Sequence, residues 1–160
     1  MKYIPYVVLL VMIGLGVLYL TPQIAHAPTV LKEASFDPKV LDLSRQNLSK
    51  LQGDVFSQTQ LERLDISSNN LTGALPAEIR HLANLKVLNA SNNRMTGVPA
   101  EIGQLSKLEV LDLSNNQLTG LPQEIANLKN LKVLDLSGNN PSKQDLDVIQ
   151  KALPDLQVIE

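Results

Sequence analysis

Leucine recurs at a spacing of 23 or 24 residues along most of this 160-residue chain. Full copies of the pattern begin at Leu61, Leu85 and Leu108, a further copy opens at Leu131, and a degenerate copy precedes them at 40–51. In each copy two apolar residues alternate with polar ones, which is the period-two pattern of a short strand with one buried face. One copy cannot shield that face alone, so successive copies must stack. The pattern predicts an α/β solenoid with one curved parallel sheet.

A second pattern follows each strand and predicts a short helical turn. Pro76, Pro99 and Pro122 each open a segment P-x-E-I-x-x-L, and proline favours the start of a helix because its backbone angle is already set. The Ile and Leu of each segment are three residues apart and therefore share one face of the turn. We expect three such pairs to point inward: Ile79/Leu82, Ile102/Leu105 and Ile125/Leu128.

An asparagine closes the strand segment of four copies, at Asn69, Asn93, Asn116 and Asn139. Its side-chain amide can satisfy backbone groups of the neighbouring copy that would otherwise be buried without partners. We interpret this Asn as a structural device. The degenerate copy has Gln46 at the same place, which predicts a less regular first copy.

The combined motif L-x-x-L-x-L-x-x-N-x-L, in units of 23 and 24 residues, resembles the leucine-rich repeat family over about 120 of the 160 residues. The L-P-x-E-I segments resemble the short repeats of bacterial and Ras-associated intracellular repeat proteins, whereas LTGALP resembles the plant receptor style. The resemblance implies a right-handed leucine-rich repeat solenoid over residues 37–160. It also implies that the concave sheet binds a protein or ligand without catalysing a reaction.

The chain from residue 142 predicts a C-terminal cap, after which we expect the domain to be complete at Glu160. Ser142 and Asp145 have the spacing of a helix start, and 156–159 predicts a last short strand. We expect the apolar face of the helix to consist of Val148, Ile149 and Leu153.

The N-terminal segment is the most hydrophobic part of the chain. Residues 3–20 carry no charge, and 18 residues of helix span about 27 Å, close to the thickness of the hydrocarbon core of a bilayer. We therefore predict a transmembrane anchor within residues 1–20, with a linker and N-terminal cover at 21–36. Lys2 precedes the segment and tyrosines lie at both of its ends, which favours a cytoplasmic N-terminus and an extracytoplasmic repeat domain.

The alternative is a signal peptide that is removed on secretion. Ala25-His26-Ala27 is a small-x-small cleavage site after an apolar run. Cleavage after Ala27 would leave Pro28 as the first residue, which disfavours a peptidase that holds its substrate extended. A secreted binding module is accordingly the second hypothesis, and a structural envelope protein that associates with copies of itself is the third.

Composition excludes several classes of chemistry. The chain has no Cys and two His, so it has no disulfide framework, no thiol nucleophile and no thiolate zinc site. It also lacks the motifs that cradle phosphates or form common hydrolase sites. Fourteen basic residues face sixteen acidic ones, and aromatics amount to 3%, which leaves little for nucleic acid to bind. We expect no enzymatic activity, no metal, no cofactor and no nucleic-acid partner.

Equivalent positions of the copies form stripes, because parallel strands stack about 4.8 Å apart. The second position alternates in sign and predicts a ladder of ion pairs. The third position carries Val, which is either structural filler or an apolar contact stripe, except at Arg63. The stripe at the second position consists of Lys39, Glu62, Lys86, Glu109 and Lys132.

The fifth position is mostly acidic, and we expect its neighbouring carboxylates to raise one another's pKa values and to favour a basic partner. The same Asp is also common in the family consensus, so a purely structural role stays open. The eighth position varies most and is the natural place for specificity, with Arg45, Ser68 and Gly138 among its residues. The candidate partner-binding residues are Asp42, Arg63, Asp65, Asn89, Asn92, Asp112, Asn115 and Asp135.

Overall fold

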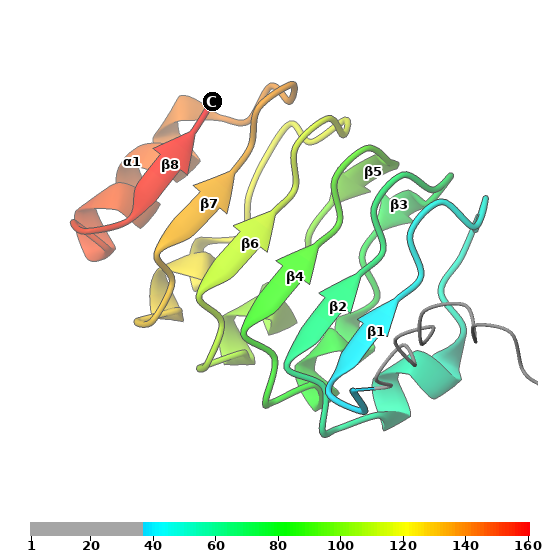
Figure 1. Cartoon of the computed structure of the whole chain (residues 1–160). Coiled ribbons are helices and arrows are strands. Elements are labelled where there is room, and N and C mark those ends of the chain that lie inside the picture. Colours follow the sequence, from blue (N-terminus) through cyan, green and yellow to red (C-terminus); the bar gives the residue numbers. More distant parts are fainter. Residues whose placement is uncertain (1–36) are drawn as a thin grey trace, which may run out of the picture. The chain divides into compact units, whose positions relative to one another are not determined.

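Three-residue strands form wherever the leucine alternation predicts them, and they stack in parallel into one six-stranded sheet (Figure 1). The computed structural model describes residues 37–160, so the predicted anchor at 3–20 and the linker at 21–36 lie outside the described residues. The strands pair in register, so that equivalent leucines lie side by side across the sheet. They are β1 (Val40–Asp42), β2 (Arg63–Asp65), β4 (Val87–Asn89), β6 (Val110–Asp112), β7 (Val133–Asp135) and β8 (Gln157–Ile159).

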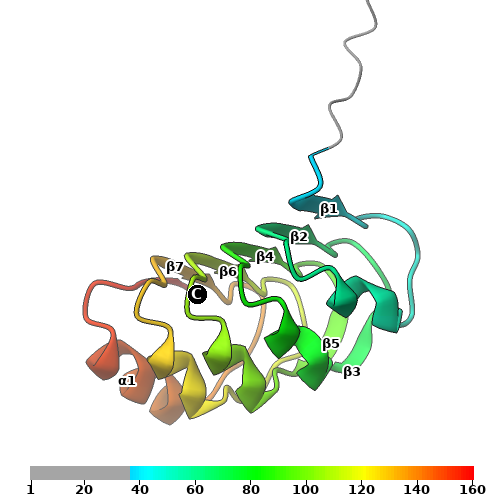
Figure 2. The ribbon, with the colours of Figure 1, turned by 90° about the horizontal axis from the view of Figure 1, so that it is seen from below.

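Short 3₁₀ helices lie on the other side of the core from this main sheet (Figure 2). Three of them follow Pro76, Pro99 and Pro122, as predicted, and each proline takes an extended conformation just before the helix. The predicted Ile and Leu pairs of these helices are completely buried, as are the strand leucines from Leu64 to Leu134. These helices are η2 (Ala77–His81), η3 (Ala100–Gln104) and η4 (Gln123–Asn127).

A fourth 3₁₀ helix, η1 (Gly53–Ser57), was not anticipated from the sequence. Gln52 stands where the later copies have proline, so the start signal is missing. Val55 and Phe56 are nevertheless buried, because the stacking of the next copy forces the same inward turn.

The prediction of a single sheet is wrong, because two parallel strands form a second sheet that is separate from the main sheet. It consists of β3 (Thr72–Ala74) and β5 (Arg94–Gly97). The register shifts between Gly73 and Ala74, and Gly73 has a φ of +74°, which glycine adopts without strain. In two consecutive copies the segment that leads from the main sheet to the 3₁₀ helix is extended here. The backbone groups of the two segments therefore pair with each other.

The segment from residue 142 contains the predicted helix α1 (Lys143–Ala152) and the predicted short strand, which is β8. One residue of its apolar face was assigned wrongly. Val148 is 37% exposed, whereas Leu146, Ile149 and Leu153 are buried. The buried residues are three and four positions apart and therefore share one helix face, which Val148 does not.

The start of α1 is held differently from the predicted cap. The side chain of Ser142 makes no capping hydrogen bond. Instead, Asp145 accepts a hydrogen bond at Oδ2 from the backbone N–H of Leu121, with a donor to acceptor distance of 3.0 Å. Asp145 thus fastens the helix to the preceding copy.

Replacing Leu111 with Ala is expected to lower the free energy of unfolding by about 2–5 kcal/mol, because the Leu111 side chain is completely buried between neighbouring strands. Thermal melts followed by circular dichroism measure this. The control is Val110→Ala in the same strand, where the side chain is only half buried and the loss should be about 1 kcal/mol or less. Equal melting temperatures for Leu111→Ala and the unaltered chain would contradict the register described here.

Candidate binding face

The outward side chains of the main sheet form one continuous surface, here called the sheet face. Because Leu64 and Leu111 point into the core, the residues on either side of them in the strand must point outward. In the register of the sheet, Asp42 lies beside Asp65, and Asp65 lies beside Asn89. The equivalent residues of the later strands continue this row across the sheet. The structure thereby brings together five of the candidates as one row, called the acidic row: Asp42, Asp65, Asn89, Asp112 and Asp135.

The other three candidates lie apart from this row. Arg63 is exposed on the sheet face, in register with Val40 and Val87. Asn92 and Asn115 are exposed but lie in the turns after β4 and β6 rather than in the strands. They flank the sheet face at its carboxyl edge.

Each member of the acidic row also has a structural task. Its Oδ1 accepts a hydrogen bond from the backbone N–H of the Ser two residues later, at distances of 2.9 to 3.1 Å. This local bond ends the strand, as Asp and Asn commonly do in turns. For Asp112 and Asp135 the Ser hydroxyl donates to the same oxygen at 2.7 Å. One carboxylate oxygen of each Asp is therefore occupied within its own turn.

The second oxygen differs along the row. Asp65 accepts at Oδ2 a hydrogen bond of 3.2 Å from the side-chain amide of Asn89. Asn89 thereby divides the row into two acidic pairs, Asp42 with Asp65 and Asp112 with Asp135.

The expectation that repulsion raises the pKa values of this row is wrong at Asp42. The pKa of Asp42 lies below its ordinary value, chiefly because the backbone N–H of Ser44 donates to its carboxylate. A hydrogen bond to the charged form favours that form.

The predicted ion-pair ladder forms in part along the amino edge of the sheet, because no salt bridge among the described residues joins Lys86 to Glu109. Glu62 pairs with two lysines, since its Oε1 lies 2.7 Å from Lys39 Nζ and its Oε2 lies 2.7 Å from Lys86 Nζ. Glu109 pairs with Lys132 at 2.5 Å. The hydrogen bonds from Lys39 and Lys86 lower the pKa of Glu62 to about 2, and Lys132 lowers that of Glu109. The positive charges on this edge are therefore largely neutralised.

The eighth position is restricted by its backbone, which the sequence did not reveal. Its residues have φ values of 52° to 57°, and Gly138 has 72°, all in the left-handed region. Asn and Gly adopt that region more readily than other residues do. At Gly138 an added Cβ would lie 2.5 Å from Asn115 Oδ1. The variation at this position thus reflects turn geometry, so the position is a weaker candidate for specificity than its sequence indicates.

The asparagines at the ninth position perform the structural role predicted for them. Asn93 donates at Nδ2 to the carbonyl groups of Ile66 and Ala90, at 3.0 and 3.1 Å, and accepts at Oδ1 from the N–H of Leu71. Asn69, Asn116 and Asn139 make the corresponding bonds. These amides join each copy to the previous one.

Metal-ligating clusters and membrane-spanning helices are both absent from residues 37–160. No group of three or more His, Cys, Asp or Glu in this part of the chain is arranged to hold a metal ion. None of the helices described is long and apolar enough to cross a membrane.

The stacked strands, returning 3₁₀ helices and buried Asn bonds define a parallel solenoid of the kind that presents one sheet as an open surface. The chain matches the model of a leucine-rich repeat region over residues 33–159. It belongs to the leucine-rich repeat family. A search of the curated proteins found no match.

Three solved structures resemble the chain over much of its length. A leucine-rich repeat protein of Leptospira interrogans is 44% identical with a TM-score of 0.66, over 70% of this chain and 28% of that one. The plant peptide hormone receptor RGFR1, in complex with RGF2, is 34% identical with a TM-score of 0.64, over 76% and 20%. The ectodomain of the receptor kinase SOBIR1 from Arabidopsis thaliana is 28% identical with a TM-score of 0.60, over 74% and 65%. This chain thus corresponds to only part of each protein.

The Glu62 pairs are expected to make stability depend on pH in the acid range. Because folding lowers the pKa of Glu62, its contribution is complete above about pH 4.5 and is lost as the pH falls toward 2. Glu62→Gln should therefore lower the urea midpoint at pH 7 and flatten the fall in that midpoint between pH 5 and 2. The control is Glu124→Gln, an exposed glutamate in the first turn of η4. Parallel pH profiles for Glu62→Gln and the unaltered chain would exclude this contribution.

Proposed function

We propose that this protein is a non-enzymatic, membrane-anchored leucine-rich repeat protein that binds a protein or peptide partner with its sheet face. The observation that carries the proposal is the acidic row, which is held in register across an open surface. The contact residues we propose are the predicted ones: Asp42, Arg63, Asp65, Asn89, Asn92, Asp112, Asn115 and Asp135.

The charge of the sheet face favours a basic partner. The lysines of the amino edge are paired with Glu62 and Glu109, so they offset little of the acidic row. Asp112 and Asp135 each use one oxygen within their own turn, and among the described residues nothing donates to the other. Those oxygens can accept hydrogen bonds from a lysine or arginine of a partner. A charged surface of this kind chiefly increases the rate of association.

The proposed location rests on the N-terminal segment and on the resemblance to receptor ectodomains. The uncharged stretch at 3–20 is long enough to cross a bilayer. The SOBIR1 structure is that of the ectodomain of a receptor kinase, and RGFR1 is a plant peptide hormone receptor that was solved in complex with RGF2. These likenesses support a repeat domain on the outer side of the membrane. Secretion after cleavage at Ala27 is the competing location.

The partner and its contact surface can be found by photo-crosslinking. A photoreactive amino acid at Val110 on the sheet face should capture the partner in native membranes, whereas the same residue at exposed Gln104 in η3 should not. Capture from Gln104 alone would move the site to the helix side and overturn the proposed face.

Changing Asp65, Asp112 and Asp135 to Asn should slow association with the captured partner and flatten its salt dependence, because long-range attraction is lost. Thermal stability should change little, since Asn89 shows that an amide oxygen can accept the same bond from the following Ser. Surface plasmon resonance at several salt concentrations measures the association rate.

The matched control removes the same number of charges elsewhere, by changing Asp54, Glu78 and Glu124 to their amides. These residues are exposed in the first turns of η1, η2 and η4. If both triple variants slow association equally, only net charge matters. If neither does, the acidic row is turn scaffolding and the binding proposal for this face fails.

The anchor is tested by the mass of the mature protein. All three tyrosines, Tyr3, Tyr6 and Tyr19, precede Ala27, and the chain has no Trp. An uncleaved chain should therefore appear in the membrane fraction with full mass and with tyrosine absorbance at 280 nm. A soluble species that begins at Pro28 and has almost no absorbance there would establish secretion instead.

A further inference from the structure

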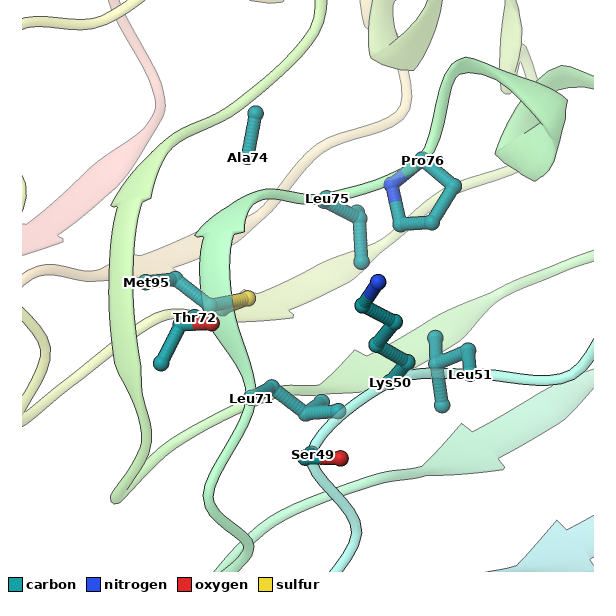
Figure 3. A pocket seen from close by; sticks show the side chains of 9 residues that line it. All are labelled: Ser49, Lys50, Leu51, Leu71, Thr72, Ala74, Leu75, Pro76 and Met95. Atoms are coloured by element: carbon teal, nitrogen blue, oxygen red, sulfur yellow. The ribbon is translucent and has the colours of Figure 1, made fainter.

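A pocket of about 230 Å³ lies outside the sheet face, between the first two copies of the repeat. Its wall on one side is the segment 49–51, and on the other side it is β3 with the two residues that follow (Figure 3). The apolar lining consists of Leu51, Leu71, Ala74, Leu75, Pro76 and Met95.

Two departures from the repeat distinguish this pocket, and the first is a difference in length between two copies. The second copy has an extra residue, since four positions separate Leu71 from Leu75 whereas three separate Leu48 from Leu51. Ala74 is that residue, and the register of β3 shifts there. The segment 49–51 forms no strand, so β3 has a strand partner on the β5 side only. On the β5 side the pocket is lined by Met95, and Gly97 pairs with Ala74.

The second departure places a cation at the pocket. The position two residues after the buried Leu or Met is glycine in the three later copies, at Gly73, Gly97 and Gly120, but it is Lys50 in the first. Figure 3 shows the Lys50 side chain extending across the pocket toward Leu75 and Pro76. No carboxylate of the described residues forms a salt bridge with Lys50. The hydroxyl groups of Ser49 and Thr72 supply further donors at the pocket.

We propose that this pocket binds a small monocarboxylate with a compact apolar body, whose carboxylate pairs with Lys50. A dry apolar cavity of about 150 Å³ is large enough for benzene, so the space here fits a ring of that size with a short acid arm. The leucines, Pro76 and Met95 remove the apolar body from water, and the ammonium of Lys50 compensates the charge of the acid. An amide of the same shape would bury the same apolar surface but would form no ion pair with Lys50.

Met95 provides a direct reporter of occupancy. The chain contains only three methionines, Met1, Met12 and Met95, so ¹³C-methyl labelling of the full chain in detergent gives few signals, and Met95→Leu identifies the relevant one. Phenylacetate should shift the Met95 signal saturably. Phenylacetamide should bind about two- to fivefold more weakly, as expected for the loss of an exposed ion pair.

Lys50→Gln should weaken the binding of phenylacetate about two- to fivefold. The variant should then bind phenylacetate and phenylacetamide with equal affinity. Lys50 is exposed, so this variant should keep its fold, which a thermal melt checks. Lys151→Gln, in the last turn of α1, is the control that removes a charge elsewhere and should bind as the unaltered chain does.

Three results would overturn the proposal: no saturable shift of Met95, equal affinities for acid and amide, or unchanged binding in Lys50→Gln. The peptide Gly-Gly-Phe forms the comparison arm. If it bound more tightly than phenylacetate, the pocket would be a site for a peptide C-terminus and the assignment to a free acid would fail.

Discussion

Buried asparagine side chains hold the copies of this repeat together, and the remaining features depend on them. Where the chain leaves each strand it must turn, and the turn leaves backbone groups that no strand or helix satisfies. Asn93 and Asn116 are buried, and their amides bond carbonyl groups of their own copy and of the copy before it. An unpaired polar group in such a place would cost about 1–3 kcal/mol. The bond therefore fixes both the turn and the distance to the neighbouring copy.

The sheet face is a consequence of that fixed distance. Once the copies are in register, alternation sends one set of side chains inward to form the leucine core and sets the other in rows on the surface. At Asp112 and Asp135 one carboxylate oxygen closes the turn that ends the strand, and no donor among the described residues reaches the other oxygen. A residue of the repeat consensus can in this way keep a free oxygen for the binding surface that we propose.

Small departures from the repeat produce the features that distinguish this chain. One inserted residue, Ala74, shifts the register between β3 and β5, and Lys50 stands where the later copies have glycine. In a solenoid each copy contacts only its neighbours, so such an irregularity stays local and the rest of the stack keeps its register. The pocket between the first two copies is therefore compatible with a regular sheet face a short distance away.

The strands of the main sheet, the inward pairs of the 3₁₀ helices, the asparagine bonds and the ion pairs of Glu62 were predictable from the sequence, because each of them repeats with the period of the chain. Features that depend on backbone conformation or on contacts between copies became visible only in the folded chain. The left-handed turns at the eighth position and the low pKa of Asp42 follow from local backbone geometry, which residue type specifies only weakly. The second sheet and the exposure of Val148 follow from how neighbouring segments pack. The pocket beside Lys50 arises from a difference in length between two copies, and only the stacked structure converts that difference into a space.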